Sequence, residues 1–252
     1  MLVMSIRVVP VRTPTLPPAT HTNCTVLDGR TVVDPASPWP EEQERLALEL
    51  ADEPLERIFL THHHHDHVAG AVDLAARRGL PIVAHPLTAA RVPFAVDETL
   101  DEGDTLHGWT ALHTPGHAAG HLCLLREGEL ICGDMVAGIG TILIEPGEGD
   151  LQTYLDSLAR LASLGPMRLW PAHGPEIPDG PAKLQEYIDH RKHRTQQVRE
   201  ALPGTPLELV ERVYGDTVPR VVWPLAALQL LCHLQWLQDR GQAQQHGERW
   251  HA

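Results

Sequence analysis

Hydrophobic and polar positions follow two different periods along this chain. Through residue 178, short apolar runs alternate with longer stretches in which apolar residues recur every three or four positions. The short runs predict strands and the longer stretches predict helices, an alternation typical of a layered α/β fold. After residue 178 only helical periods remain. The pattern therefore predicts an α/β domain over residues 1–178 and a small helical domain over residues 179–252.

Turn and cap signals set the limits of the predicted elements. Residues 1–38 are expected to form short strands and turns, with Asp28-Gly29 as the tight turn of a hairpin. Asp150 is the expected N-cap of an amphipathic helix. The other predicted elements of the first domain are helices at 41–51, 68–78 and 150–164, and strands at 57–61, 81–84, 109–112, 122–125 and 130–132, with further strand as far as Ile144.

The second domain opens with a predicted helix over residues 181–201. A second helix starts after Thr205, because Thr205 can cap its first turn, Pro206 suits the first helical position and Glu208 completes a capping box. Residues 223–240 predict a third helix, apolar and aromatic, before a polar tail.

Composition narrows the class of protein. With 252 residues, 42% of them hydrophobic, the chain can bury a large core, which excludes the disordered and fibrous classes. Its formal net charge of −13 disfavours nucleic acid as a partner. The sequence has no apolar run long enough to span a membrane, and its four cysteines show no paired spacing. We therefore expect a cytoplasmic protein with reduced thiols and no membrane partner, as a monomer or a homodimer.

A run of histidines broken by one aspartate, from His62 to His67, is the most distinctive stretch of the chain. It lies between a predicted strand and a predicted helix, where layered α/β folds usually build ligand sites. His62 and His64 alternate and can project to one side, whereas Asp66 and His67 follow where the chain turns into the helix. Zinc accepts imidazole and carboxylate ligands, so this spacing offers ligands to two metal ions.

One loop cannot complete two metal sites, and isolated residues farther along the chain supply further candidate ligands. His117, Asp134 and His173 each stand close to glycine or proline at the end of a predicted strand, where the backbone turns. His63 and His65 of the histidine run are expected to lie behind the ligands or at the surface.

The chain resembles the metallo-β-lactamase superfamily in four motifs taken together. They are Thr61-His62-x-His64-x-Asp66-His67-x-x-Gly70, Thr114-Pro115-Gly116-His117-x-x-Gly120-His121, Gly133-Asp134 and Pro171-x-His173-Gly174. The resemblance implies a four-layer αββα sandwich with a dinuclear site between its two sheets. It implies these ligands: His62, His64 and His117 for one metal, Asp66, His67 and His173 for the other, and Asp134 bridging both.

The aspartate at position 134 points to particular branches of that superfamily. Secreted zinc β-lactamases of the best-known subclass have cysteine there, so the resemblance leans to the glyoxalase II-like, thioesterase and nuclease branches. The resemblance also places Asp34 near the metal site, without direct contact to the metal. Cys132, two residues before Asp134, is expected in the core.

The last third of the chain resembles the beta-lactamase-like protein 2 subfamily, which appends a small winged-helix-like domain. The matching phrase is Leu184-Gln-Glu-Tyr187-Ile-x-His190-Arg191-x-x-Arg194-x-x-Gln197. Members of that subfamily include a single-strand endoribonuclease and thioesterases that act on carrier-bound polyketides. In the family this helix approaches the mouth of the active site, which implies that His190, Arg191 and Arg194 contact an anionic substrate.

These features predict a metal-dependent hydrolase. Two divalent ions, zinc by default and iron or manganese as alternatives, can share a hydroxide that attacks the substrate, and Asp66 can orient that hydroxide or receive its proton. The leading expectation is cleavage of an ester, thioester or amide-like bond in a small or carrier-bound acid. Two alternatives stay open: an endoribonuclease that cleaves single-stranded RNA, and a metal-dependent binding or regulatory module without catalysis.

Overall fold

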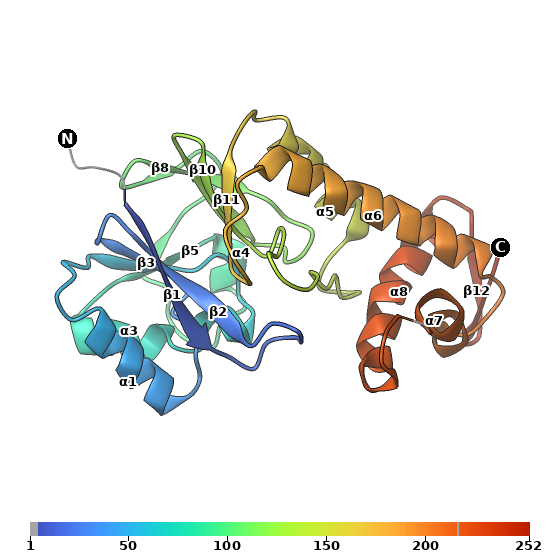
Figure 1. The fold of residues 1–252 in the computed structure, drawn as a ribbon, viewed down its shortest axis with the longest axis horizontal. Helices are drawn as coiled ribbons and strands as arrows, with labels where there is room; N and C mark the ends of the chain where they lie inside the picture. The colour runs from blue at the N-terminus through green and yellow to red at the C-terminus, as the bar shows by residue number, and fades with distance from the viewer. Residues whose placement is uncertain (1–4, 216) are drawn as a thin grey trace.

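The structure is a computed structural model that describes residues 5–215 and 217–252; residues 1–4 of the predicted strand-and-turn region lie outside it. Figure 1 shows a body built on two sheets and a smaller helical body, joined by one long helix. The predicted fold class, α/β with a helical C-terminal part, is confirmed.

Two mixed sheets form the larger body. The six-stranded sheet has the order β1 (Ile6–Arg12), β2 (His21–Leu27), β3 (Thr31–Val33), β4 (Arg57–Phe59), β5 (Ile82–Ala84) and β6 (Glu98–Thr99), antiparallel from β1 to β3 and parallel from there on. The five-stranded sheet has the order β11 (Arg168–Pro171), β10 (Glu129–Gly133), β9 (Leu122–Arg126), β8 (Trp109–His113) and β7 (Thr105–Leu106). Only its β10–β11 pair is parallel.

Each sheet separates two cores because successive side chains of a strand point to opposite faces. On β4, Ile58 packs on the outer side of the first sheet, whereas Phe59 packs between the sheets. On β10, Ile131 packs between the sheets, whereas Cys132 packs on the outer side of the second. Cys132 therefore lies in the core, as predicted.

Helices cover both outer faces and complete the four layers. α1 (Pro40–Glu49) and α3 (Ala71–Arg78) contribute Leu46 and Leu74 to the core outside the first sheet, and Leu50, directly after α1, joins them. α5 (Leu151–Ala162) and the first half of α6 (Gly180–Glu200) cover the second sheet. Two short helices, α2 (His65–Val68) and α4 (Pro86–Ala89), follow strands of the first sheet. The αββα sandwich implied by the resemblance is thus present.

Several local predictions are also confirmed. Asp28 and Gly29 have φ of 53° and 66°, the left-handed backbone of a tight hairpin turn, and they join β2 to β3. The Asp150 side chain accepts a hydrogen bond from Thr153 N and caps α5. Each predicted helix and strand up to β10 is observed to within a few residues, except that the helix predicted at 68–78 begins earlier and divides into α2 and α3.

The strand predicted as far as Ile144 is wrong. β10 ends at Gly133, and residues 134–149 form a loop before α5. Met135, Ile142 and Ile144 are buried in the core beneath α5 and α6. Their apolar character therefore reflects burial of a loop and not pairing in a sheet.

The C-terminal part is a helical unit with a small two-stranded sheet. It contains α7 (Pro206–Tyr214), a 3₁₀ turn (Arg220–Val222) and α8 (Trp223–Asp239), and Thr205 and Glu208 form the predicted capping box at the start of α7. The tail is polar, as predicted, but it also forms an antiparallel hairpin of β12 (Gln244–His246) and β13 (Arg249–His251), which the sequence pattern did not predict. Trp250 is buried and exchanges backbone hydrogen bonds with Gly204, which holds the hairpin on the helices.

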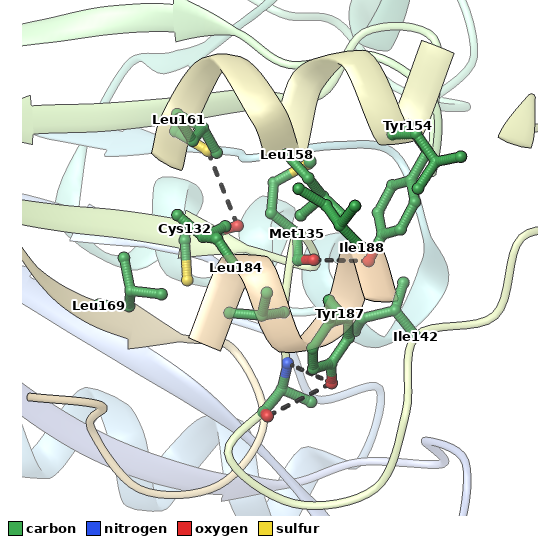
Figure 2. Packing of buried hydrophobic residues seen from close by; sticks show 14 of the residues in the cluster. Cys132, Met135, Ile142, Tyr154, Leu158, Leu161, Leu169, Leu184, Tyr187 and Ile188 are labelled. Atoms are coloured by element: carbon green, nitrogen blue, oxygen red, sulfur yellow. Dashed lines mark hydrogen bonds between the residues drawn. The ribbon is translucent and has the colours of Figure 1, made fainter. Parts of the chain in front are cut away.

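α6 takes part in the cores of both parts of the chain. Leu184, Tyr187 and Ile188 near its start pack against α5 and the second sheet, as Figure 2 shows. Val198 near its end packs with Leu209 of α7 and the C-terminal helices. The expected domain boundary at residue 178 therefore falls just before a helix that both parts share.

Two further expectations concern the surface and the thiols. Among the described helices, none is both long enough and apolar enough to cross a lipid bilayer. The four cysteines are all buried and unpaired, as predicted.

Candidate metal centre

The seven predicted ligands converge at one edge of the sandwich, where strands of both sheets end. His62 and His64 lie in the loop after β4, and Asp66 and His67 lie on α2. The other three follow β8, β10 and β11 of the second sheet, in the order His117, Asp134 and His173. Ligands that are distant in sequence therefore meet because the carboxyl ends of these strands lie together.

Three imidazoles form the first cluster. His62 Nε2 lies 2.9 Å from His64 Nδ1 and 3.2 Å from His117 Nε2. Thr61 donates its only hydroxyl proton to Asp34, so it accepts from His62 Nδ1 and leaves the lone pair of His62 Nε2 facing the cluster. Converging nitrogen lone pairs of this kind suit a bound cation.

A carboxylate and two imidazoles form the second cluster. His173 Nε2 lies 3.6 Å from Asp66 Oδ2, and His67 Nε2 lies 4.0 Å from Asp66 Oδ1. These three residues can hold a metal ion between them. The structure thus brings together the residues of each group that the resemblance names.

Asp134 lies between the two clusters. Its Oδ2 is 3.5 Å from His117 Nε2 of the first cluster. Its Oδ1 is 3.5 Å from both His67 Nε2 and His173 Nε2 of the second cluster. Asp134 Oδ1 and His67 Nε2 are buried without a hydrogen-bond partner. Buried polar atoms without partners are costly, so this donor set fits bound cations on both sides of Asp134.

Hydrogen bonds on the far side of three rings fix their orientation. His67 Nδ1 donates to Asp34 Oδ2 at 2.9 Å, and His117 Nδ1 donates to the Leu143 carbonyl at 2.8 Å. His173 Nδ1 donates to a backbone carbonyl at 3.0 Å. Each bond leaves Nε2 free to bind a metal, an arrangement common among metal-ligating histidines. Asp34, expected only near the site, is therefore a residue that orients a ligand.

Burial and neighbouring charges set the protonation states of the site. Burial lowers the pKa of His62 well below the usual imidazole value and the pKa of His64 to about 2. Burial also opposes the charged form of His67, but the carboxylates of Asp134 and Asp34 outweigh it and raise its pKa. Burial would raise the pKa of Asp134, but the surrounding imidazoles lower it well below its usual range. Neutral imidazoles beside an ionised carboxylate are ready for metal binding, and a cation at His67 would replace its proton.

Three neighbouring histidines have other positions. His63 Nε2 lies 2.5 Å from Glu148 Oε1, and His65 is exposed, so neither belongs to the two clusters. His121 is fully buried; its Nε2 accepts a hydrogen bond from the backbone of Asp134 at 3.1 Å. The Gly120-His121 motif indicated this residue, but its role could not be assigned from the sequence.

A cavity of about 280 Å³ opens onto the centre, and His64, Asp66, His117, Asp134 and His173 line it. The three predicted substrate residues do not line this cavity. They line a second cavity of about 550 Å³ between the sandwich and the C-terminal helices. Both cavities share three wall residues: Leu16, Thr141 and Leu143.

The three predicted substrate residues differ in accessibility. His190 is exposed, whereas Arg191 is only 2% exposed and donates through Nη2 to the Ile142 carbonyl. Arg194 is half-buried, donates to the Val213 carbonyl at 3.0 Å and stacks over Tyr214.

Comparison with known families decides the class of the centre. A family model described as metallo-beta-lactamase superfamily matches residues 17–94 and 89–173. The chain belongs to this superfamily. A second model, the beta-lactamase associated winged helix domain, matches residues 205–250. The metallo-beta-lactamase superfamily generally comprises metal-dependent hydrolases.

Relatives within the metallo-beta-lactamase superfamily extend over most of the chain. The lactamase-like protein vrtG of Penicillium aethiopicum is 39% identical over 204 residues, which are 72% of this chain and 62% of that protein. The beta-lactamase-like protein 2 homolog of Drosophila melanogaster is 31% identical over 217 residues, 74% of this chain and 70% of that protein. The chain thus spans less than two thirds of the length of vrtG.

Solved structures of this superfamily share the fold. A metallo-beta-lactamase family protein from Thermus thermophilus is 24% identical with a TM-score of 0.83, and the match covers 98% of both chains. The protein TTHA1623, solved in a di-iron-bound form, is 26% identical with a TM-score of 0.52 over 75% of this chain and 93% of that one. The first match includes the C-terminal part and shows that the whole arrangement recurs.

Replacing Asp34 with asparagine should weaken metal binding about 10- to 100-fold at the position held by His67. Asp34 accepts from Thr61 N through Oδ1 and from His67 Nδ1 through Oδ2; an amide has one oxygen, so its NH₂ group would face one of these two donors. Asparagine tolerates the φ of 48° at this position. Competition with a chromophoric chelator measures the affinity, and Asp73→Asn on the surface of α3 is the control. Affinity equal to that of the unchanged protein would contradict the orienting role.

Proposed function

We propose that this superfamily member holds two divalent metal ions and hydrolyses an ester, thioester or amide-like bond of a small or carrier-bound acid. The observation that carries the proposal is the position of Asp134. Its Oδ2 lies 3.5 Å from His117 Nε2 of the first cluster, and its Oδ1 lies 3.5 Å from His67 Nε2 of the second. A single carboxylate between two complete ligand clusters fits a bridging role between two cations.

The two clusters and Asp134 would hold the ions, whose chemistry would be to acidify water and to act as a Lewis acid toward the reacting oxygen of the substrate. The residues of the chain bind the ions and limit the access of bulk water to them. Asp66 lines the cavity and its side chain is 20% exposed, so its carboxylate can receive a proton at the solvent side. His62 and His67 are fully buried and keep bulk water from the inner side of the centre. Water attacks directly, so no covalent acyl-enzyme forms.

Zinc is the proposed metal, because three imidazoles in one cluster and a mixed imidazole and carboxylate set in the other suit it. Iron is the specific alternative, since TTHA1623 binds two iron ions with a related fold. Metal analysis of protein purified without chelator decides between them.

The second cavity supports an acid with an apolar body as the substrate. Its walls are mostly apolar, and they include Arg194 and His190 but, among the described residues, no aspartate or glutamate. In a chain with a net charge of −13, an opening with arginine and without described carboxylates favours an anionic group. We propose that Arg194 and His190 contact this group while the scissile bond lies at the metal centre.

Endoribonuclease activity is the second candidate. Lys192 and His193 are exposed on α6 between Arg191 and Arg194 in the sequence, and this basic segment favours a polyanion. The apolar cavity walls favour the first candidate, because stacked bases and phosphates need polar or aromatic surfaces along a longer path.

Zinc-loaded protein should hydrolyse members of a thioester panel and leave a single-stranded RNA intact. Asp66→Ala should abolish the hydrolysis, which excludes a contaminating enzyme. Arg194→Gln should lower kcat/KM about tenfold for a thioester with a distal carboxylate and spare its neutral counterpart, because a charge-assisted hydrogen bond contributes about 1.5–3 kcal/mol. Arg199→Gln, exposed on the same helix, is the control. RNA cleavage without thioester hydrolysis would favour the second candidate instead.

A further inference from the structure

The loop between β10 and α5 contacts both the metal centre and the C-terminal helices. Three consecutive residues of this loop, Ile142, Leu143 and Ile144, each form a backbone hydrogen bond to a different side chain. The middle carbonyl, of Leu143, accepts from His117 Nδ1 at 2.8 Å. The bonds on either side of it come from helices α6 and α8 and not from the sandwich.

Arg191 and Gln229 are the two residues that hold these flanking positions. Arg191 on α6 donates through Nη2 to the Ile142 carbonyl. Gln229 on α8 accepts from Ile144 N through Oε1 at 3.0 Å. Arg191 is 2% exposed and Gln229 is 8% exposed, so water competes little for these bonds. A three-residue segment therefore joins a metal ligand to the C-terminal helices.

Helices α5 and α6 hold the start of the loop, directly after Asp134. The Tyr154 hydroxyl on α5 donates to the Met135 carbonyl at 2.6 Å, and the Tyr187 hydroxyl on α6 accepts from Ala137 N at 3.0 Å. Figure 2 shows both tyrosines extending from their helices to this segment. The loop is thus held by α5 and α6 at Met135 and Ala137 and by α6 and α8 at Ile142 and Ile144.

We propose that Arg191 and Gln229 are positioning residues for the metal ligand His117. By fixing the residues on both sides of Leu143, they fix the carbonyl that orients the imidazole and keeps its Nε2 toward the first cluster. This role rests on the two-metal centre proposed above. This role differs from the one proposed for Arg194, which contacts the substrate. The Arg191 guanidinium donates to the Ile142 carbonyl in the cavity wall and acts through His117.

The proposal predicts a change at one metal position only. The rings of the second cluster are oriented elsewhere, His67 by Asp34 and His173 by the His21 carbonyl. Neither contact involves the loop held by Arg191 and Gln229. Loss of either residue should therefore weaken the position of the first cluster and spare the other.

Gln229→Leu tests this link in the full-length protein. Zinc titration against a chromophoric chelator should show that the unchanged protein binds two equivalents of zinc. The variant should bind one equivalent with unchanged affinity and the other about tenfold more weakly, or weaker still. The visible spectrum of the cobalt-substituted variant should change for that weaker equivalent alone. Gln229→Glu keeps an acceptor for Ile144 N and should restore the affinity. Gln235→Leu, exposed on α8, is the matched control.

Two results would overturn the positioning role. One is unchanged affinity for both equivalents in Gln229→Leu; the other is equal weakening of both together with a lower melting temperature, which marks a general structural defect. Fewer than two equivalents in the unchanged protein would instead refute the two-metal centre, so the two failures are distinguishable.

Discussion

Asp134→Asn should lower kcat/KM by at least about a thousandfold, because one substitution affects both ligand clusters. An amide offers one oxygen and no charge, so it cannot face His117 on one side and His67 and His173 on the other as the carboxylate does. The side chain is similar in size, so the fold should persist. Steady-state kinetics on the thioester panel with zinc in excess measures the effect.

Asp156→Asn makes the same chemical change on the exposed face of α5 and should leave the activity unchanged. Excess zinc separates weak binding from lost chemistry, because saturation would restore a centre that was merely weakened. If Asp134→Asn kept more than a tenth of the activity, the bridging role of Asp134 would be wrong.

Gly70→Ala should destabilise the fold by roughly 3 kcal/mol or more, a large effect that arises from overlap with the backbone. A Cβ at Gly70 would lie 1.9 Å from the Pro35 carbonyl oxygen, and backbone atoms cannot move aside as a flexible side chain can. Gly70 follows α2, which carries Asp66 and His67, and the residue it meets follows Asp34. Urea unfolding of the metal-free protein measures the loss.

Gly79→Ala is the matched control for this prediction. Gly79 ends α3 with a φ of 65° and has open space around its Cα, so alanine there should cost only about 1 kcal/mol of backbone strain. Equal losses at the two positions would show that the close approach at Gly70 relaxes easily. A larger loss at Gly70 than at Gly79 would show that the first motif requires glycine because of close packing and not because of chain flexibility.

Much of the centre could be predicted because its signals are local. Motif spacing and adjacent glycine or proline indicated the seven candidate ligands, and the structure brings these residues together from both sheets. The sequence also shows which residues of the histidine run alternate, and His63 and His65 lie outside the clusters as expected. Strands and helices with clear periods were likewise predicted to within a few residues.

The failures have physical causes that no local pattern contains. The loop after Asp134 is apolar because α5 and α6 cover it, and an apolar run alone cannot distinguish a buried loop from a strand. The terminal hairpin consists mainly of exposed polar residues and depends on Trp250 and its contact with Gly204, which are 46 positions apart (250 − 204). The resemblance placed Arg191 among the candidate substrate contacts, but its burial and its bond to Ile142 follow from the packing of α6, which no local pattern contains.

The sharing of α6 between two cores affects how the chain must unfold. A helix that buries Leu184 against the sandwich and Val198 against the C-terminal helices transmits the melting of either side to the other. The C-terminal part is therefore not a detachable module: ending the chain before α6 would leave the apolar face of α5 exposed and prone to aggregation. A winged-helix part from a relative could replace this one only if the new α6 also fitted the surface of α5, because cutting the chain at residue 180 or at residue 205 separates side chains that pack together.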